Sequence, residues 1–125
     1  METDNKHPRG LKHVWHATLT ALAGLRAAWQ HEDAFRQEVL IAAVAMPVAL
    51  LLPVTLPGKA LMIASILLVL IVELLNSAIE AAVDHTSLER HPLAKRAKDI
   101  ASAAVLLSIV NAVVVWGLII TLPLY

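Results

Sequence analysis

Two consecutive stretches of sequence decide the fold of this chain: Ala60-Leu-Met-Ile-Ala-Ser-Ile-Leu-Leu-Val-Leu-Ile-Val72 and Glu73-Leu-Leu-Asn-Ser-Ala-Ile-Glu-Ala-Ala-Val-Asp84. The first is the purest hydrophobic run in the protein, and the second adds polar residues at offsets 0, 3, 4, 7 and 11 from its start. At about 100° per residue, these offsets fall within roughly 100° of arc on one helix. Carboxylates on a helix in a bilayer are costly unless they face protein, water or a bound cation. We therefore interpret this polar stripe as a functional site, formed by Glu73, Asn76, Ser77, Glu80 and Asp84.

The composition indicates a small membrane protein with a single domain. The chain has 125 residues, of which 58% are hydrophobic, and its mean hydropathy is +0.70. Such a chain is too apolar for a soluble domain, because a short chain cannot hide this much apolar surface. Ten basic residues balance ten acidic residues, so the net charge gives no reason to expect a nucleic acid partner. The absence of cysteine excludes disulfides and thiolate chemistry, and the polar N-terminus predicts no cleaved signal peptide.

Residues 1 to about 30 are predicted to form a polar tail and an amphipathic helix on the membrane surface. Large apolar residues recur there at helical spacing, among lysine, histidine and arginine side chains. The segment carries too many polar groups to cross a bilayer, and its tryptophans suit the depth of the lipid headgroups. The alternative is a helix that packs on a soluble face of the protein. The apolar positions are Leu11, Val14, Trp15, Leu19, Leu22, Leu25 and Trp29.

Three membrane spans are predicted to follow the surface helix, so that the fold class is an all-α membrane protein. The apolar run Val39–Leu52 is short for a span of about 20 residues and must be extended at both ends. Pro47 is tolerable inside it where neighbouring helices satisfy the freed carbonyl. A tight turn at Pro53–Gly58 and a break before Pro92 separate the spans. The predicted spans are about 34–56, 60–84 and 93–122.

The distribution of positive charge predicts the orientation of the chain. Nine of the ten lysine and arginine residues lie before the first span, at its start, or after the second span. Only Lys59 lies in the turn between the first two spans. Because loops rich in lysine and arginine stay on the cytoplasmic side, the open end of the polar stripe should face the cytoplasm, where nucleotides are found.

Charged side chains from several segments are predicted to converge at this cytoplasmic boundary. Crowded carboxylates repel one another, and Mg²⁺, which usually arrives with substrate phosphates, relieves that repulsion. Lysine and arginine beside carboxylates suit a triphosphate. Glu73 lies deeper than Glu80 by about 10 Å at 1.5 Å per residue, so a lipid hydroxyl is the natural proton donor to its partly buried carboxylate. The converging residues are Glu32, Glu38, Glu73, Asn76, Glu80, Lys95, Lys98, Asp99 and Ser102, with Arg26 and Arg36 nearby in sequence.

Other functions remain open from these residues alone. Glu73 and Glu80 could pair with Lys98 or Arg36 simply to close a helix bundle, and Glu73 with Asn76 could form the relay of a small proton or cation conductor. The histidines have no HExxH spacing for zinc, and Gly58-Lys59 lacks the glycines of a phosphate-binding loop. The chemistry of the side chains therefore leaves a kinase, a conductor and a structural membrane protein as alternatives.

Four segments stand in the order and at the spacing of one known family: Gly24-Leu-Arg-Ala-Ala-Trp29, Ala34-Phe-Arg-Gln-Glu38, Val72-Glu-Leu-Leu-Asn-Ser-Ala-Ile-Glu80 and Ala94-Lys-Arg-Ala-Lys-Asp99. From about residue 20 to 120 the chain resembles the prokaryotic integral-membrane diacylglycerol kinase family of Gram-negative type. The resemblance implies a homotrimer in the bacterial inner membrane that transfers the γ-phosphoryl group of Mg-ATP to 1,2-diacylglycerol, giving phosphatidic acid. One position departs from the family pattern, because His13 stands where an arginine is usual. The segment before Lys98 is also similar to undecaprenol kinases, which makes that lipid the alternative acceptor.

The resemblance also implies roles for individual residues of this sequence. Glu73 matches the general base, and Glu32 and Glu80 match the carboxylates that hold Mg²⁺ with ATP. The other positions that match nucleotide-binding residues are Asn76, Glu89, His91, Lys98 and Asp99. The positions that match lipid-binding residues, together with Glu73, are Arg26, Trp29, Phe35, Arg36, Gln37, Ser102 and Trp116.

Overall fold

The structure is a computed structural model that describes residues 10–86 and 92–122. Within these ranges the chain forms four α-helices and no strand. Three of the four helices are long and apolar enough to cross a membrane, which confirms the prediction of an all-α membrane protein. The helices are α1 (Leu11–His31), α2 (Asp33–Leu51), α3 (Leu56–Thr86) and α4 (Pro92–Thr121).

The chain divides into two units, residues 1–32 and 33–125, and the first of them contains α1. Gly10 precedes this helix with a φ of 65°, a left-handed conformation that glycine adopts without steric cost. The polar side chains inside the helix bond to its own backbone: the Thr18 hydroxyl donates to the Val14 carbonyl, and the Thr20 hydroxyl to the His16 carbonyl. All seven predicted apolar positions of α1 are exposed, as expected of a helix whose apolar side chains are covered by something other than its own unit.

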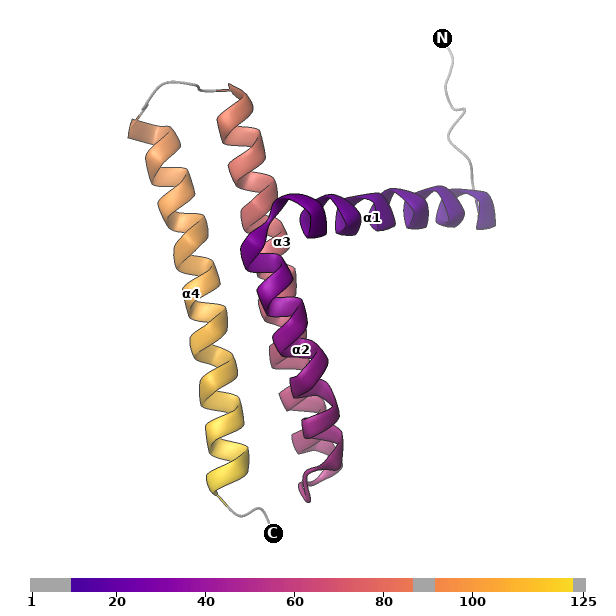
Figure 1. Ribbon diagram of the computed structural model, residues 1–125, viewed down its shortest axis with the longest axis vertical. Coiled ribbons are helices and arrows are strands. Elements are labelled where there is room, and N and C mark those ends of the chain that lie inside the picture. The colour runs from indigo at the N-terminus through magenta and orange to yellow at the C-terminus, as the bar shows by residue number, and fades with distance from the viewer. Residues whose placement is uncertain (1–9, 87–91, 123–125) are drawn as a thin grey trace. The chain divides into compact units, whose positions relative to one another are not determined.

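The second unit contains α2, α3 and α4, and α3 packs against both of the others (Figure 1). Small side chains on the outer helices let the backbones approach closely, as is common between membrane helices; they are Ala42 and Ala49 on α2 and Ala101 and Ala112 on α4. The buried positions of α3 recur every three or four residues and form one continuous seam. They are Gly58, Met62, Ser65, Val69, Glu73 and Asn76.

The connection between α2 and α3 differs from the expected boundaries, since α2 ends at Leu51 and α3 already begins at Leu56. Pro53 has no backbone N–H and cannot extend α2. The Lys59 Nζ donates to the Leu50 and Leu52 carbonyls, at 2.7 and 2.6 Å, which satisfies the end of α2. The Thr55 hydroxyl accepts from the Gly58 N–H at 3.2 Å and caps the start of α3. The ammonium group of Lys59 therefore bonds to backbone carbonyls of the turn.

Candidate functional site

The polar stripe on α3 runs from the buried seam to the exposed end of the helix. Glu73 and Asn76 are only 4% and 8% exposed, whereas Ser77 and Glu80 are partly exposed and Asp84 is exposed. At 1.5 Å per residue, the distance from Glu73 to Asp84 along the helix is about 16 Å. The stripe thus connects a group in the apolar interior with groups at the aqueous boundary.

A carboxyl group from α2 meets the buried end of the stripe. The side chain of Glu38 lies within hydrogen-bonding reach of the Glu73 carboxyl group. Two carboxyl groups this close repel one another when both are charged, so they need a proton or a cation between them. The pairing of helices α2 and α3 therefore places two acidic groups together at the depth where the apolar part of α3 ends.

Three oxygen atoms near this pair are shielded from solvent and have no hydrogen-bond partner in the described part of the chain. They are Glu38 Oε1, Asn76 Oδ1 and Ser77 Oγ. An unpaired buried polar atom costs about 1–3 kcal/mol, and the membrane interior supplies no water to relieve that cost. Three such atoms in one region indicate that a ligand completes the site.

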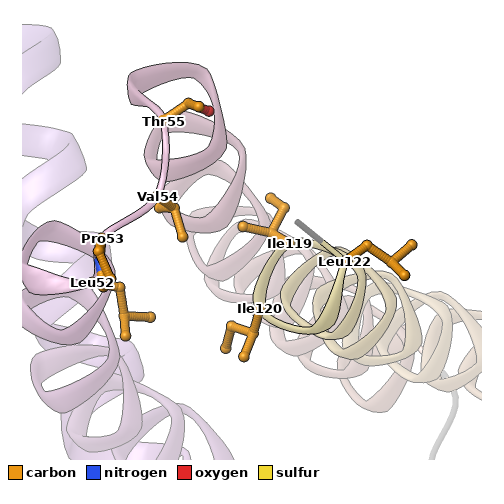
Figure 2. Close-up of a pocket in the computed structure, with 7 residues that line it drawn as sticks. All are labelled: Leu52, Pro53, Val54, Thr55, Ile119, Ile120 and Leu122. Carbon is orange, nitrogen blue, oxygen red and sulfur yellow. The ribbon is translucent and has the colours of Figure 1, made fainter. Parts of the chain in front are cut away.

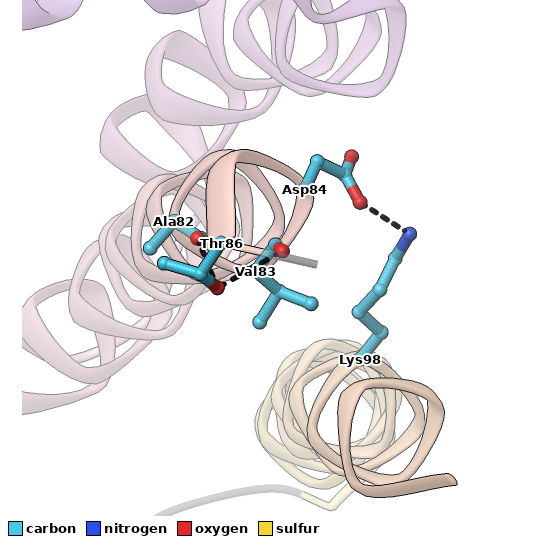
Figure 3. Close-up of polar contacts among 5 residues, drawn as sticks. All are labelled: Ala82, Val83, Asp84, Thr86 and Lys98. Atoms are coloured by element: carbon cyan, nitrogen blue, oxygen red, sulfur yellow. Dashed lines mark hydrogen bonds and ion pairs between the residues drawn. The ribbon is translucent and has the colours of Figure 1, made fainter. Parts of the chain in front are cut away.

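A second group of charged residues lies at the polar end of the unit, where α3 ends and α4 begins. The Lys98 Nζ of α4 contacts the Asp84 Oδ1 of α3 at 2.9 Å (Figure 3), and Lys98 is also near enough to Glu80 to feel its charge. Figure 3 also shows the Thr86 hydroxyl bonded to the Ala82 and Val83 carbonyls at the end of α3. This boundary cluster of Glu80, Asp84 and Lys98 combines negative and positive groups, as an ion such as a phosphate with its metal requires.

An apolar groove leads away from Glu38 along the three helices. It has a volume of about 360 Å³, with Glu38 as its one ionisable lining residue and Trp116 among the apolar ones. The Trp116 indole N–H donates to the Met62 carbonyl at 3.1 Å, which fixes the ring against α3. The groove is lined by Glu38, Ile41 and Ala45 of α2, Ile66, Val69 and Leu70 of α3, and Ile109, Ala112, Val113 and Trp116 of α4.

A further cavity lies at the opposite end of the helices, where the α2–α3 connection meets the end of α4 (Figure 2). It has a volume of about 340 Å³ and no titratable side chain among the residues that line it: Leu52, Pro53, Val54, Thr55, Ile119, Ile120 and Leu122. Without an acid, a base or a nucleophile, this cavity offers no chemistry, and the candidate site is the one around Glu73.

The structure brings some predicted site residues together and separates others. Lys98 is near enough to Glu80 for their charges to attract each other. Asp99 instead pairs with Lys95 on its own helix, with 2.7 Å between Lys95 Nζ and Asp99 Oδ2. Arg36 pairs with Asp33 within α2.

Other predicted site residues lie elsewhere in the described chain or beyond it. Phe35 is buried, whereas Gln37 on α2 and Ser102 on α4 are exposed. Glu89 and His91 lie outside the described residues. The predicted residues that belong to the first unit are Arg26, Trp29 and Glu32.

Glu38 was predicted to be one of the converging charged residues, but the sequence assigned it no individual role. The signal for it was present in α2, where Phe35, Glu38, Ala42 and Ala49 follow one another at offsets 0, 3, 7 and 14 and so share one helix face. Because Phe35, Ala42 and Ala49 are buried, the carboxyl group of Glu38 had to face the neighbouring helices. The periodicity of α2 could therefore have indicated that Glu38 faces α3.

Comparison with known proteins identifies the family to which the chain is similar. The family model described as prokaryotic diacylglycerol kinase matches residues 19–120. The chain is 55% identical over 114 residues to a protein of Pseudomonas aeruginosa named diacylglycerol kinase, covering 91% of this chain and 93% of that protein. It is 53% identical over 93 residues to the protein of that name from Escherichia coli K12, with coverages of 74% and 76%. The corresponding protein of Haemophilus influenzae is 44% identical over 108 residues, with coverages of 86% and 92%.

Proposed function

Because the chain belongs to the prokaryotic diacylglycerol kinase family, we propose that it transfers the γ-phosphoryl group of ATP to the hydroxyl of 1,2-diacylglycerol, giving phosphatidic acid. The observation that carries this proposal is the position of Glu73. Its carboxyl group is buried beside Glu38 at the end of an apolar groove, and the same helix continues to a boundary cluster of charged groups. A lipid alcohol and a water-soluble phosphate donor can meet at this depth.

Glu73 is the general base of the proposed reaction. It accepts the proton of the lipid hydroxyl as the hydroxyl oxygen attacks the γ-phosphorus, and the electron pair of the broken bond leaves with ADP. Burial keeps water away from this carboxyl group, so that a lipid alcohol rather than water reaches it. The apolar groove that begins at Glu38 suits an acyl chain of the lipid, because its lining is otherwise apolar.

The boundary cluster is the nucleotide side of the site. Lys98 is a donor for phosphate oxygens, and Asn76 offers an unpaired buried oxygen. We assign Glu89 and His91, in the connection before α4, and Asp99 to the same nucleotide on the strength of the family resemblance.

Glu32 and Glu80 are the carboxylates that we assign to Mg²⁺. Glu80 and the Asn76 amide oxygen are hard oxygen donors of the kind that this ion prefers, and Mg²⁺ usually takes its remaining ligands from water and from the substrate phosphates. When bound, the ion would neutralise charge on the triphosphate.

We assign the lipid side of the site partly from the groove and partly from the family resemblance. Trp116 lines the groove itself, and Phe35 is buried on the same helix as Glu38. The remaining assigned positions are Arg26, Trp29, Arg36, Gln37 and Ser102, which follow from the family resemblance.

The proposed working form is a homotrimer in the bacterial inner membrane, with its sites on the cytoplasmic side. The number of exposed apolar side chains on α2 and α4 suits helices that contact lipid or further copies of the chain. The concentration of lysine and arginine beside the boundary cluster supports a cytoplasmic site.

The deciding experiment is a phosphorylation assay of the purified protein in lipid bilayer discs. We expect radiolabel from γ-labelled ATP to appear in phosphatidic acid when 1,2-diacylglycerol is supplied with Mg²⁺, and to be lost when EDTA removes the ion. Undecaprenol serves as the matched acceptor, and kcat/KM for the two lipids identifies the substrate. Labelling of undecaprenol alone, or of neither lipid, would refute the proposal.

A further inference from the structure

Ser77 carries the one buried hydroxyl of the described helices for which the fold provides no partner. Buried serines in helices normally bond to a carbonyl of their own helix. Ser65 does so to the Met62 carbonyl, and Ser108 to the Val105 carbonyl, each at 2.7 Å. The Ser77 Oγ is equally shielded from solvent but makes no such bond within the described residues. A free hydroxyl held in this way indicates that its partner is a ligand.

The direction in which Ser77 lies on α3 identifies the side of the site that it serves. The groove is floored by Ile66, Val69 and Leu70. At about 100° per residue, Ser77 lies within about 20° of the direction of both Ile66 and Leu70, and Glu73 falls inside the same arc. Asn76 lies at the margin of that arc. Ser77 and Glu73 therefore continue the floor of the groove, and both face a lipid that occupies it.

The chemistry of the acceptor explains why a hydroxyl donor is useful at this position. The oxygen of the attacking alcohol gives its proton to Glu73 and uses one lone pair to form the bond to phosphorus, which leaves a second lone pair available. Ser77 lies one helical turn from Glu73 toward the boundary cluster, about 6 Å along the helix. Its O–H can donate to that second lone pair and so fix the direction of the attacking oxygen.

We propose that Ser77 is a further binding residue for the acceptor lipid, whose hydroxyl oxygen accepts a hydrogen bond from the Ser77 side chain. Ser77 keeps its own proton throughout the reaction. The bond to phosphorus forms, the bond from phosphorus to ADP breaks, and the lipid proton goes to Glu73. This inference rests on the proposed lipid kinase function and adds to it the residue that orients the alcohol.

The test compares Ser77→Ala with the matched variant Ser65→Ala, in which the same substitution on the same helix removes a hydroxyl that is already bonded. We expect Ser77→Ala to raise KM for diacylglycerol by about three- to tenfold, the effect of one lost hydrogen bond, with KM for ATP changed by less than about twofold. Ser65→Ala should leave both KM values unchanged. A dialkyl ether glycerol, which has the hydroxyl but no ester carbonyl, should show the same increase in the Ser77→Ala variant.

Thermal unfolding separates this role from a structural one. Since Ser77 has no partner within the described chain, Ser77→Ala removes an unpaired buried hydroxyl and should raise the unfolding midpoint of the lipid-free protein, whereas Ser65→Ala should lower it. An unchanged KM for diacylglycerol, an increase in KM for ATP instead, or a lowered midpoint would overturn the assignment. Failure of the wild-type protein to phosphorylate any lipid would refute the proposed function itself. If the wild-type protein is active, the results for the Ser77→Ala variant test only the role of Ser77.

Discussion

Glu73 is a carboxyl group buried next to a second carboxyl group, Glu38, in a segment where charge is costly. A folded protein that served only to hold helices together would gain from replacing such a pair with apolar side chains of similar size. The contact with Glu38 places a second acid beside Glu73, and Lys98, one of the cations considered as its partner, contacts Asp84. The cost of the acidic pair is therefore explained by chemistry rather than by stability.

The variant Glu73→Gln tests this at the level of one residue. The amide keeps the size of the side chain but cannot accept a proton, so we expect kcat to fall by about 100- to 10,000-fold. Mg-ATP should still bind, and the folded state should be at least as stable because repulsion with Glu38 is removed. Lipid phosphorylation, nucleotide binding and thermal unfolding measure these effects. A rate near that of the wild type would remove Glu73 from the role of base.

At the scale of the helices, α3 determines the site because both α2 and α4 pack against it. Its buried seam passes from Met62 and Val69 to Glu73 and Asn76 without a change of face. The apolar part of the helix thereby anchors the polar part between its neighbours. The Asp84–Lys98 contact joins α3 to α4 at the polar end, where Asp84 is exposed and Lys98 is partly exposed, so that water weakens the attraction between them.

Substitutions in this ion pair distinguish a structural link from a phosphate-binding group. Asp84→Asn should change stability and activity little, since an exposed ion pair contributes little. Lys98→Met should lower kcat/KM for ATP by about 100-fold, because it removes a positive charge from the transferring phosphate. Lys95→Met, at an exposed lysine whose bond lies within α4, is the matched control. Equal losses of activity in Asp84→Asn and Lys98→Met would show that Lys98 acts only through the pair.

At the scale of the whole molecule, the three long helices of the second unit have different ends. One end carries Glu80, Asp84 and the basic start of α4. The other end carries Lys59, whose ammonium group donates hydrogen bonds to the carbonyls at the end of α2. This asymmetry should orient the chain in the membrane, because uncompensated lysine and arginine remain in the cytoplasm.

The orientation can be measured directly, because the protein contains no cysteine and single cysteines give unique labels. A membrane-impermeant maleimide should label Leu56→Cys from the periplasmic side of spheroplasts. It should label Thr86→Cys only in inside-out vesicles. Both positions are exposed in the fold, so accessibility depends on the membrane alone. The reverse pattern would place the proposed nucleotide side away from the cytoplasm and contradict it.

Local pattern accounts for the features that the sequence determined by itself. The number of long apolar helices follows from the length of the apolar runs, and the shared face of Glu73, Asn76 and Glu80 follows from helical periodicity. Both depend on residues a few positions apart, whose relation is the same in any helix. The ends of α2 and α3 were less well predicted, because the Lys59 and Thr55 caps decide them through contacts across the turn.

Only the tertiary structure decided which side chains meet between helices. The contact of Glu38 with Glu73, the choice of Asp84 as the partner of Lys98, and the groove beside Trp116 all depend on how α2 and α4 are rotated and shifted against α3. That rotation is set by the packing of small residues such as Ala42, Ala101 and Ala112, which are buried between helices. Such packing joins residues far apart in the chain, and no periodicity within a single helix contains the information.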